Sequence, residues 1–360
     1  MVKYSLVGCG RIAKNHIGAA QSCQNIAISS LCDVEIKQAE SLAQRFGLQD
    51  AVIYTHFKEM LQKERPDLVA IATDSGSHAE IALEAINQGC NVIIEKPIAL
   101  SLEDADLLIA AAQRKGIVAA VCHQNRFNPA VAVLKNAIEH QRLGKLLYGA
   151  ATIRWFRPQD YYDQANWRGK WETDGGALMN QCIHDIDLLR WMLGDPVEVA
   201  AVTARQSHSI EAEDFGAALV KFANGAFGIV EGTTNVYPEN LEETLCIFGT
   251  CGTVKLGGSS LNLLEEWRLA DSLENIEQLK EACNQRPPDI YGYGHLPLYR
   301  DVISAMEHGR QPLVTLKEGR AAMELVLAIY NAAYQNKPIR MPLGQCATTD
   351  FKGRFESEHT

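Results

Sequence analysis

The sequence predicts an α/β fold in two domains, a doubly wound parallel sheet followed by an α+β domain with an open, mostly antiparallel sheet. Short apolar runs alternate with helix-patterned segments in the first third of the 360-residue chain. After about residue 125 the rhythm changes to longer alternating segments, and a glycine-rich loop directly follows the first apolar run. A chain of this length also suits two hydrophobic cores better than one.

The first third of the chain is expected to form the parallel sheet, over residues 1–125. The apolar runs predict buried strands at Tyr4–Val7, Ile26–Cys32, Leu68–Ala72, Val92–Glu95 and Val118–Cys122. The segments between them predict helices at Ile12–Ser22, Glu35–Phe46, Ala79–Gln88 and Leu102–Lys115. Strict alternation of strand and helix is typical of right-handed crossovers with helices on both faces of the sheet.

Residues 126–342 are expected to form a substrate and oligomerisation domain that ends in helices. Strands are expected at Leu147–Trp155, Glu198–Arg205, Phe215–Phe222, Ala226–Thr233, Glu243–Phe248 and Thr253–Leu256. Helices are expected at Ala130–His140, Ala177–Leu193, Pro297–His308 and Leu316–Gln335. Asn224-Gly225 is a strong hairpin signal between two of the strands. The polar tail, residues 343–360, is expected to be poorly ordered.

Charge and cysteine content restrict the possible partners. The net charge of −10 argues against a broad surface for nucleic acid or anionic membrane. The ten cysteines include no C-x-x-C pair, which favours reduced, buried thiols and no metal site. The chain enters a strand at once and has no apolar run of membrane-spanning length. We therefore expect a cytoplasmic protein.

The glycine-rich loop indicates a dinucleotide site. Gly8-Cys9-Gly10-Arg11-Ile12-Ala13 is a G-x-G-x-x-A motif between a strand and a helix, the arrangement of a Rossmann domain that binds pyrophosphate at the helix N-terminus. Asp33 ends the second strand, where a carboxylate accepts hydrogen bonds from the adenine ribose and repels a 2′-phosphate. We therefore expect NAD rather than NADP. A role of Asp33 as a cap of the following helix is compatible with this one.

A lysine stands at the carboxyl edge of the same sheet, in Glu95-Lys96-Pro97. Ligands bind at this edge in doubly wound folds. An ammonium at a strand end suits a group that hydrogen-bonds a substrate hydroxyl and stabilises a developing alkoxide. Lys96 as an ordinary surface residue at a loop start is the alternative.

The second chemical signal is the segment from Gly175-Gly176 to His184. On one helix, Asn180 and His184 would be i, i+4 neighbours on the same face. Histidine titrates near the working pH, so His184 can accept a hydroxyl proton as hydride leaves. A structural histidine is the alternative.

Basic and aromatic residues gather just before this segment. The basic residues are Arg154, Arg157, Arg168 and Lys170, and arginine presents a donor fork suited to carboxylate or diphosphate. The aromatic residues are Trp155, Phe156, Tyr161, Tyr162, Trp167 and Trp171. They could line a pocket for sugar or uracil, and for any single one a place in the core or an interface is the better expectation.

These motifs together resemble the Gfo/Idh/MocA family of oxidoreductases, over roughly residues 1–342. The resemblance implies NAD(P)-dependent oxidation or reduction of sugars and cyclitols, with Lys96 and His184 as the catalytic pair. It also implies that Trp167-Arg168 touches the nicotinamide end of the cofactor. Many members have Asp where this chain has Asn180. Because Asn cannot ionise, an acid–base role at that position is in doubt.

Longer stretches resemble the WlbA/WbpB branch of that family. They are Tyr161-Tyr162, residues 167–172, Asp174-Gly175-Gly176, residues 179–184 and residues 232–238. This resemblance implies NAD-dependent oxidation of the 3-hydroxyl of UDP-N-acetyl-glucosaminuronate, a UDP-linked N-acetylated sugar acid, for lipopolysaccharide O-antigen. It also implies a homo-oligomer, dimer or homotetramer, and leaves open whether 2-oxoglutarate recycles NADH in place.

The expected site can be stated residue by residue. The substrate-binding residues are Lys96, Arg157, Tyr161, Arg168, Asn180 and His184. The cofactor-binding residues are Gly8, Gly10, Arg11, Ile12, Asp33, Thr73, Ser75, His78, Glu95, Lys96, Trp167 and Arg168. Two other functions stay open: a dehydrogenase for a free sugar or inositol, and a non-catalytic NAD-binding regulator. A regulator need not keep both Lys96 and His184.

Overall fold

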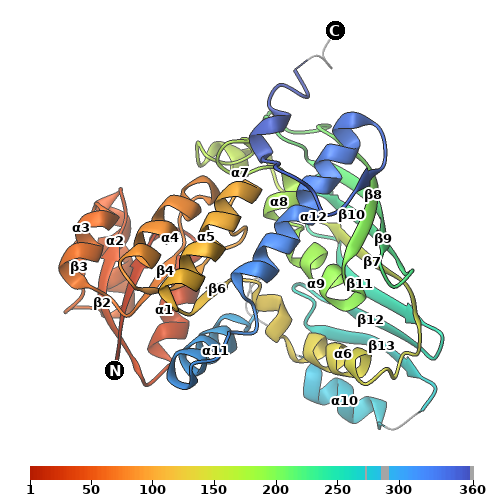
Figure 1. Ribbon diagram of the computed structural model, residues 1–360, viewed down its shortest axis with the longest axis horizontal. Coiled ribbons are helices and arrows are strands. Elements are labelled where there is room, and N and C mark those ends of the chain that lie inside the picture. Colours follow the sequence, from red (N-terminus) through yellow and green to blue (C-terminus); the bar gives the residue numbers. More distant parts are fainter. Residues whose placement is uncertain (272–273, 285–291, 357–360) are drawn as a thin grey trace. The chain divides into compact units, whose positions relative to one another are not determined.

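The computed structural model describes residues 1–271, 274–284 and 292–356 of the chain, which form two compact units (Figure 1). The first unit comprises Met1–His123 and His295–Arg320, and the second comprises Gln124–Gly294 and Ala321–Thr360. The α/β fold class is confirmed, since a parallel sheet forms one unit and a mixed sheet forms the other.

The first unit is built on a six-stranded parallel sheet with the order β3-β2-β1-β4-β5-β6. Its strands are β1 (Val2–Val7), β2 (Ile26–Cys32), β3 (Val52–Tyr54), β4 (Leu68–Ile71), β5 (Asn91–Ile94) and β6 (Ala119–Val121). Its helices are α1 (Ala13–Gln21), α2 (Ile36–Phe46), α3 (Phe57–Glu64), α4 (His78–Asn87) and α5 (Leu102–Lys115), with a 3₁₀ turn η1 (Ser75–Ser77). The strand order reverses between β1 and β4, which is where such sheets bind ligands.

Helix α11 (His295–His308) belongs to this first unit, although the chain position of Pro297–His308 placed it in the second domain. The Tyr299 hydroxyl explains the difference, because it lies 2.8 Å from the Tyr4 hydroxyl and 2.8 Å from His16 Nδ1. Tyr299 is fully buried, so these polar contacts tie α11 to β1 and α1.

The second unit is built on an eight-stranded sheet with the order β13-β12-β11-β7-β10-β9-β8-β14. Its strands are β7 (Leu146–Arg154), β8 (Pro196–Ala204), β9 (Phe215–Phe222), β10 (Phe227–Thr233), β11 (Glu242–Gly249), β12 (Gly252–Gly257), β13 (Leu263–Leu269) and β14 (Ile339–Arg340). β7 and β10 run parallel and every other neighbouring pair is antiparallel. The expected Asn224-Gly225 turn joins β9 to β10, with Gly225 at φ 86°.

Helices and short turns complete the second unit. They are η2 (Gln124–Phe127), α6 (Pro129–Glu139), α7 (Gln159–Asp163), α8 (Ala177–Asn180), α9 (Ile183–Leu193), α10 (Ile276–Cys283) and η3 (Thr348–Phe351). Helix α12 (Leu316–Gln335) begins in the first unit and contributes most of its length to the second. α8 packs against β9 and β10, and α9 against β7, β10 and β11.

The prediction of one continuous helix over Ala177–Leu193 is wrong. The chain forms α8, then a break at Gln181-Cys182, then α9. The cause is a wide turn: the amide of Cys182 donates to the carbonyl of Ala177 at 2.9 Å, five residues back instead of four. Asn180 and His184 therefore are not ideal i, i+4 neighbours.

The prediction of a poorly ordered tail is also wrong for residues 343–356, while residues 357–360 lie outside the described residues. Phe351 and Phe355 are 2% and 1% exposed and pack around the ring of Trp171. Thr348 Oγ1 donates to the carbonyl of Trp171 at 2.5 Å. Two phenylalanines in a polar segment thus dock the tail onto the core of the second unit.

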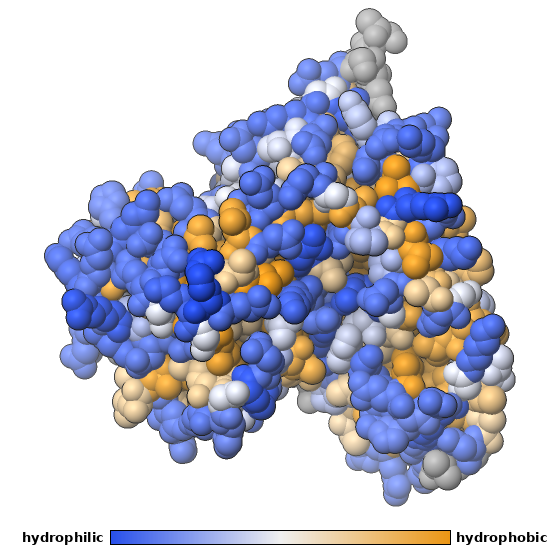
Figure 2. Space-filling model, viewed as in Figure 1, coloured by the Kyte–Doolittle hydropathy of each residue, from blue (hydrophilic) through white to orange (hydrophobic). Residues whose placement is uncertain are grey.

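The surface shows the mixture of polar and apolar side chains that the composition predicts. Figure 2 shows a face that is mainly hydrophilic, with smaller hydrophobic areas between. All ten cysteines lie within the described ranges, and all are free thiols, eight of them buried. Within the described part of the chain, no helix has the length and apolar character needed to cross a membrane.

Candidate active site

The glycine loop has the geometry of a dinucleotide cradle. Gly8 has φ 91°, and a Cβ there would lie 2.4 Å from the carbonyl oxygen of Ala72, so only glycine fits. A Cβ on Gly10 meets no protein atom within 4 Å, so open space faces this backbone. α1 starts at Ala13 with Ile12 at its N-cap, directly after the loop, and the N-terminus of a helix suits a pyrophosphate. Arg11 is exposed beside them.

Asp33 is fixed in front of this loop. One carboxylate oxygen accepts from the amide of Cys9 at 2.7 Å, and the other accepts from the amide of Glu35 at 2.9 Å. Asp33 is thus bound both to the glycine loop and to Glu35, the residue before α2, although α2 (Ile36–Phe46) has no side-chain cap. Each carboxylate oxygen has a further lone pair, which is what a ribose hydroxyl needs.

The segment after β4 supplies three further predicted residues. Ser77 Oγ donates to Thr73 Oγ1 at 2.7 Å, and Ser75 is buried in η1. His78 is 1% exposed, with Nδ1 2.8 Å from the Pro97 carbonyl and Nε2 3.3 Å from the Thr73 carbonyl. His78 therefore joins the segment after β4 to the loop that follows Lys96.

Glu95 and Lys96 follow β5, at the same sheet edge as Gly8, Asp33 and Thr73. Glu95 is 6% exposed, and its Oε1 lies 3.0 Å from His16 Nε2 and 3.7 Å from His295 Nε2. Burial by itself would raise the pKa of Glu95, but the two histidines hold it well below its usual value.

Burial lowers the pKa of His16, and both of its ring nitrogens have a partner: Nδ1 lies 2.8 Å from the Tyr299 hydroxyl and Nε2 lies 3.0 Å from Glu95 Oε1. One ligand atom each from His16, Glu95 and His295 lie within 4.8 Å of one another. Because both nitrogens of His16 are already used, hydrogen bonding accounts for this cluster. Sequence reasoning missed His16, which follows the glycine motif by three residues, and His295, which lies far from the motifs along the chain.

In the second unit, the segment carrying Asn180 and His184 is anchored by Glu213. The Glu213 carbonyl accepts from the amide of Ala177 at 2.9 Å, and its Oε1 accepts from the amide of Leu178 at 2.8 Å and from the Tyr330 hydroxyl at 3.0 Å. A Cβ on Gly176 would lie 1.8 Å from Glu213 Oε2, which explains the glycine. Burial raises the pKa of Glu213 to about 8. No motif marks Glu213 in the sequence.

Both predicted residues of this segment are partly exposed. Asn180 Nδ2 donates to Asp174 Oδ1, and Asp174 Oδ2 accepts from the amide of Gly169 at 2.7 Å. Asn180 is thus oriented by a buried carboxylate. His184 lies on the first turn of α9.

The basic and aromatic residues separate into two groups. Arg157 and Arg168 place their guanidinium carbons 5.4 Å and 4.3 Å from the centre of the Tyr161 ring, and Arg168 lies 5.2 Å from the half-buried ring of Trp167. Arg154 is bound instead to Glu231 at 2.7 Å and Glu242 at 2.9 Å. Arg154 thus differs from Arg157 and Arg168, because it is paired with carboxylates on the two neighbouring strands. Of the aromatic residues, Trp155, Tyr162 and Trp171 are buried.

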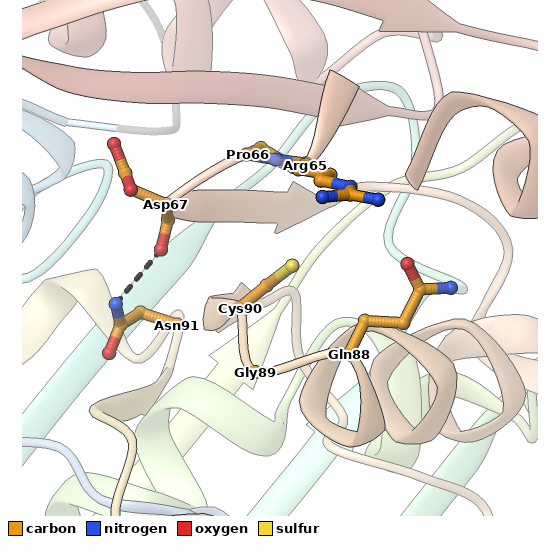
Figure 3. Close-up of a pocket in the computed structure, with 7 residues that line it drawn as sticks. All are labelled: Arg65, Pro66, Asp67, Gln88, Gly89, Cys90 and Asn91. Carbon is orange, nitrogen blue, oxygen red and sulfur yellow. Dashed lines mark hydrogen bonds between the residues drawn. The ribbon is translucent and has the colours of Figure 1, made fainter. Parts of the chain in front are cut away.

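The structure thus gathers the predicted residues into one set per unit. The first unit holds Gly8, Gly10, Arg11, Ile12, Asp33, Thr73, Ser75, His78, Glu95 and Lys96, and the second holds Arg157, Tyr161, Trp167, Arg168, Asn180 and His184. A hollow of about 500 Å³ in the first unit lies elsewhere, at the amino ends of β4 and β5 between Arg65, Asp67 and Gln88 (Figure 3). It is at the opposite edge from the glycine loop.

Comparison with known proteins agrees with this fold. Residues 2–123 match the model of the oxidoreductase family with an NAD-binding Rossmann fold, and residues 131–255 match the GFO/IDH/MocA C-terminal domain. The WlbA dehydrogenase from Bordetella pertussis, solved with NADH and UDP-GlcNAcA, is 36% identical with a TM-score of 0.90 over 95% of this chain and 98% of that one.

Two further relatives extend the comparison. The WlbA dehydrogenase from Chromobacterium violaceum, also solved with NADH and UDP-GlcNAcA, is 34% identical with a TM-score of 0.87 over 95% of this chain and 96% of that one. A D-apiose dehydrogenase from Paraburkholderia graminis is 26% identical over 94% of this chain and 89% of its own length.

The fold and the site define an NAD-dependent dehydrogenase that acts on a sugar or polyol. The two family matches cover more than half of the chain, and the chain belongs to the Gfo/Idh/MocA family of oxidoreductases. Because the chain belongs to this class of enzymes, the alternative function of a non-catalytic NAD-binding regulator is excluded.

Proposed function

We propose that the enzyme oxidises the 3-hydroxyl of UDP-N-acetyl-glucosaminuronate to the 3-keto sugar, with NAD as the acceptor. The two WlbA dehydrogenases support this proposal, because each resembles the chain over nearly its whole length and carries UDP-GlcNAcA in its structure. The product would then serve the synthesis of lipopolysaccharide O-antigen in the cytoplasm.

The observation that carries the proposal is the pair of arginines at Tyr161. Arg157 is held beside the ring by bonds from its Nη1 to the Phe156 carbonyl at 2.6 Å and to Asn240 Oδ1 at 3.1 Å, and Arg168 by a bond from its Nη1 to the Tyr161 carbonyl at 2.7 Å. Two cations concentrated in this way in a protein of net charge −10 suit an anionic substrate. A neutral free sugar would need neither.

The chain's own residues then have separate roles. We assign His184 to take the proton of the 3-hydroxyl and Lys96 to hydrogen-bond the same oxygen and stabilise negative charge on it. Asn180 orients the sugar, since an amide can donate and accept hydrogen bonds but cannot ionise. NAD bound at the glycine loop supplies the hydride acceptor.

A substrate panel tests the proposal. NADH formation is measured with UDP-N-acetyl-glucosaminuronate, with UDP-N-acetylglucosamine, which lacks the carboxylate, and with free sugars and inositol. We expect the highest kcat/KM for the acidic nucleotide sugar and a large loss of that preference in Arg157→Met. The exposed Arg268→Met, also in the second unit, serves as the matched control.

A dehydrogenase for a free sugar is the alternative function, favoured by the D-apiose dehydrogenase. Equal or better turnover of free sugars in the same panel would replace the proposal by this alternative. Adding 2-oxoglutarate to enzyme that carries bound NADH then tests recycling in place, since recycling would abolish the absorbance of NADH.

A further inference from the structure

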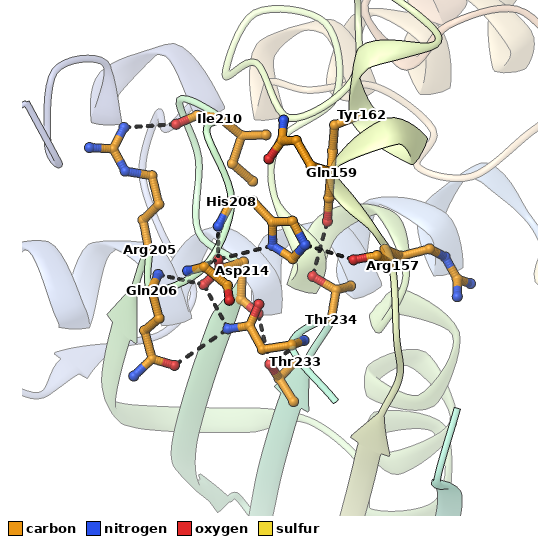
Figure 4. Close-up of polar contacts among 12 residues, drawn as sticks. Arg157, Gln159, Tyr162, Arg205, Gln206, His208, Ile210, Asp214, Thr233 and Thr234 are labelled. Carbon is orange, nitrogen blue, oxygen red and sulfur yellow. Dashed lines mark hydrogen bonds and ion pairs between the residues drawn. The ribbon is translucent and has the colours of Figure 1, made fainter. Parts of the chain in front are cut away.

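A buried histidine lies directly behind the Arg157 segment and was not predicted as part of the site. His208 is 9% exposed, and its two ring nitrogens point at two different acceptors (Figure 4). Nδ1 lies 3.1 Å from Asp214 Oδ2, and Nε2 lies 2.7 Å from the backbone carbonyl of Arg157.

These two contacts determine the charge of the ring. A neutral imidazole has one N–H, whereas both acceptors here, a carboxylate and a carbonyl, can only accept. Both contacts are hydrogen bonds only when both ring nitrogens carry a proton, which makes His208 an imidazolium. Burial would lower the pKa of His208, but the bonds to Asp214 and to the Arg157 carbonyl raise it above its ordinary value.

Asp214 is a fully buried carboxylate that matches this cation. Its Oδ1 accepts from the amide of Gln206 at 2.8 Å and from Asn235 Nδ2 at 3.0 Å, and its Oδ2 accepts from the amides of Ser207 and His208 at 2.8 and 3.0 Å. Although burial opposes ionisation, these bonds and His208 lower the pKa of Asp214 to about 2.

The other ionisable groups near the His208 ring, Tyr162 and Arg205, do not take a proton from it. The Tyr162 ring centre lies 4.8 Å from that of His208, and burial raises the pKa of its hydroxyl, which lies 3.0 Å from Thr234 Oγ1. Arg205 on the same loop donates to the carbonyls of Ile210 and Phe355. The imidazolium is therefore paired with Asp214.

The backbone of Arg157 is held by a hydrogen bond on each side, and the imidazolium makes one of the two. The amide of Arg157 donates to the Thr234 carbonyl at 3.0 Å, and its carbonyl accepts from His208. Without the second bond, a carbonyl in a largely buried environment would lose its partner, and the segment that leads to Tyr161 would lose an anchor.

We infer that His208, paired with Asp214, is a positioning residue for recognition of the acidic group of the substrate, because it holds the Arg157–Tyr161 segment in place. The inference rests on the proposed function and assigns Arg157 to the carboxylate of the anionic sugar. It assigns to this buried pair a part in specificity and none in the hydride transfer itself.

The kinetic test compares His208→Gln with His140→Gln, an exposed histidine of the same unit whose Nδ1 contacts the carbonyl of Asn136 in its own helix. We expect KM for UDP-N-acetyl-glucosaminuronate to rise about tenfold in His208→Gln, the effect of losing roughly 1.4 kcal/mol of positioning. KM for UDP-N-acetylglucosamine, the Kd for NAD and kcat should change little. Equal effects on both nucleotide sugars, or no effect on either, would overturn the inference.

The pH dependence gives a second test. The folded pKa of His208 is raised, so the imidazolium is present at low pH and is lost as pH rises through that pKa. In the wild type, KM for the acidic sugar should therefore rise at alkaline pH, and this rise should disappear in His208→Gln. An identical KM profile in the two proteins contradicts the inference.

A spectroscopic test needs neither substrate nor a stable variant. In protein labelled with ¹⁵N-histidine, both ring nitrogens of His208 should carry protons at pH 7. A neutral His208 ring at pH 7 overturns the inference even if the substrate proposal holds. If the substrate panel instead shows no preference for the acidic sugar, the proposed function fails while an imidazolium in the spectrum remains.

Discussion

The predicted sites of the two units are built from different parts of the chain. In the first unit the predicted cofactor site consists mostly of backbone, namely the glycine loop and the start of α1. Its one carboxylate, Asp33, accepts hydrogen bonds from backbone amides. In the second unit the predicted substrate site is made of long side chains held in place by buried polar groups, with Glu213 behind α8 and Asp214 behind His208. A backbone site tolerates little change in shape, whereas a side-chain site can change its chemistry one residue at a time.

The largest expected effect lies in the second unit. His184→Asn should lower kcat by about 10²- to 10⁴-fold, the usual result of losing a positioned general base. The Kd for NAD should stay constant, because the predicted cofactor residues of the glycine loop and Asp33 are untouched. Stopped-flow kinetics and NAD titration measure both quantities, with His140→Asn as the matched control. Turnover at the wild-type rate would make His184 a structural residue.

Lys96 tests the comparison between the two units further, because it lies in the first unit but is predicted to take part in catalysis. Lys96→Met should lower kcat and also raise KM for the sugar, since in its proposed role the ammonium would contact the hydroxyl before and during the reaction. Steady-state kinetics separate the two effects, and the exposed Lys115→Met at the end of α5 is the control. An unchanged KM together with an unchanged kcat would remove Lys96 from the site.

Cofactor preference is expected to respond more weakly. Asp33→Ser removes the carboxylate that repels a 2′-phosphate, so the ratio of kcat/KM for NAD over NADP should fall about tenfold, equal to roughly 1.4 kcal/mol. The exposed Asp50→Ser controls for loss of one negative charge. A wild-type enzyme that uses NADP as well as NAD would contradict the role of Asp33.

The outer face of the second sheet predicts self-association. Val202, Leu219, Phe227 and Ile229 on β8, β9 and β10 are 60%, 60%, 53% and 43% exposed, an apolar set that usually marks an interface. Phe227→Glu should therefore shift the protein toward the monomer in sedimentation velocity, whereas Leu107→Glu on α5 of the first unit should not. A wild-type monomer at micromolar concentration would refute the predicted dimer or tetramer.

The smallest effect concerns stability. The pKa of Glu213 is raised from 4.5 to about 8 by burial, so between these values the unfolded chain has lost a proton that the folded chain keeps. This group therefore destabilises the fold increasingly as pH rises from about 4.5 to 8. Glu213→Gln should gain several degrees in Tm over the wild type across that range, on the order of 2–4 °C per kcal/mol. Exposed Glu239→Gln is the control, and parallel Tm profiles would contradict the assignment.

Sequence patterns predicted the strands and helices that are long or flanked by clear signals. α5 begins and ends at the predicted residues, because Ser101 caps its start and Gly116 adopts a left-handed φ of 65° at its end. β3 was missed, because its apolar run is only three residues long and all three are at least partly exposed. β13 was missed since Glu265, Glu266 and Arg268 interrupt its apolar positions.

Site residues that belong to a sequence motif were predicted, whereas residues that only the three-dimensional structure brings to the site were missed. Glycines at a strand end indicate a cradle from spacing alone, whereas His208 meets the Arg157 carbonyl from 51 positions away. The partners of Arg154, Glu231 and Glu242, could not be predicted either, because they lie on neighbouring strands that only the sheet register brings together. Long-range pairing of this kind has no local signal in a single sequence.

The wide turn between α8 and α9 has an evolutionary consequence. The Cys182 amide bonds five residues back, so the helical segment behaves as if one residue had been inserted into a regular helix. Deleting that residue would restore a continuous helix and rotate everything after it by about 100°. His184 and the buried face of α9 would then change direction together. The length of this segment is therefore constrained as strictly as its composition, and homologues should vary there by substitution and not by insertion or deletion.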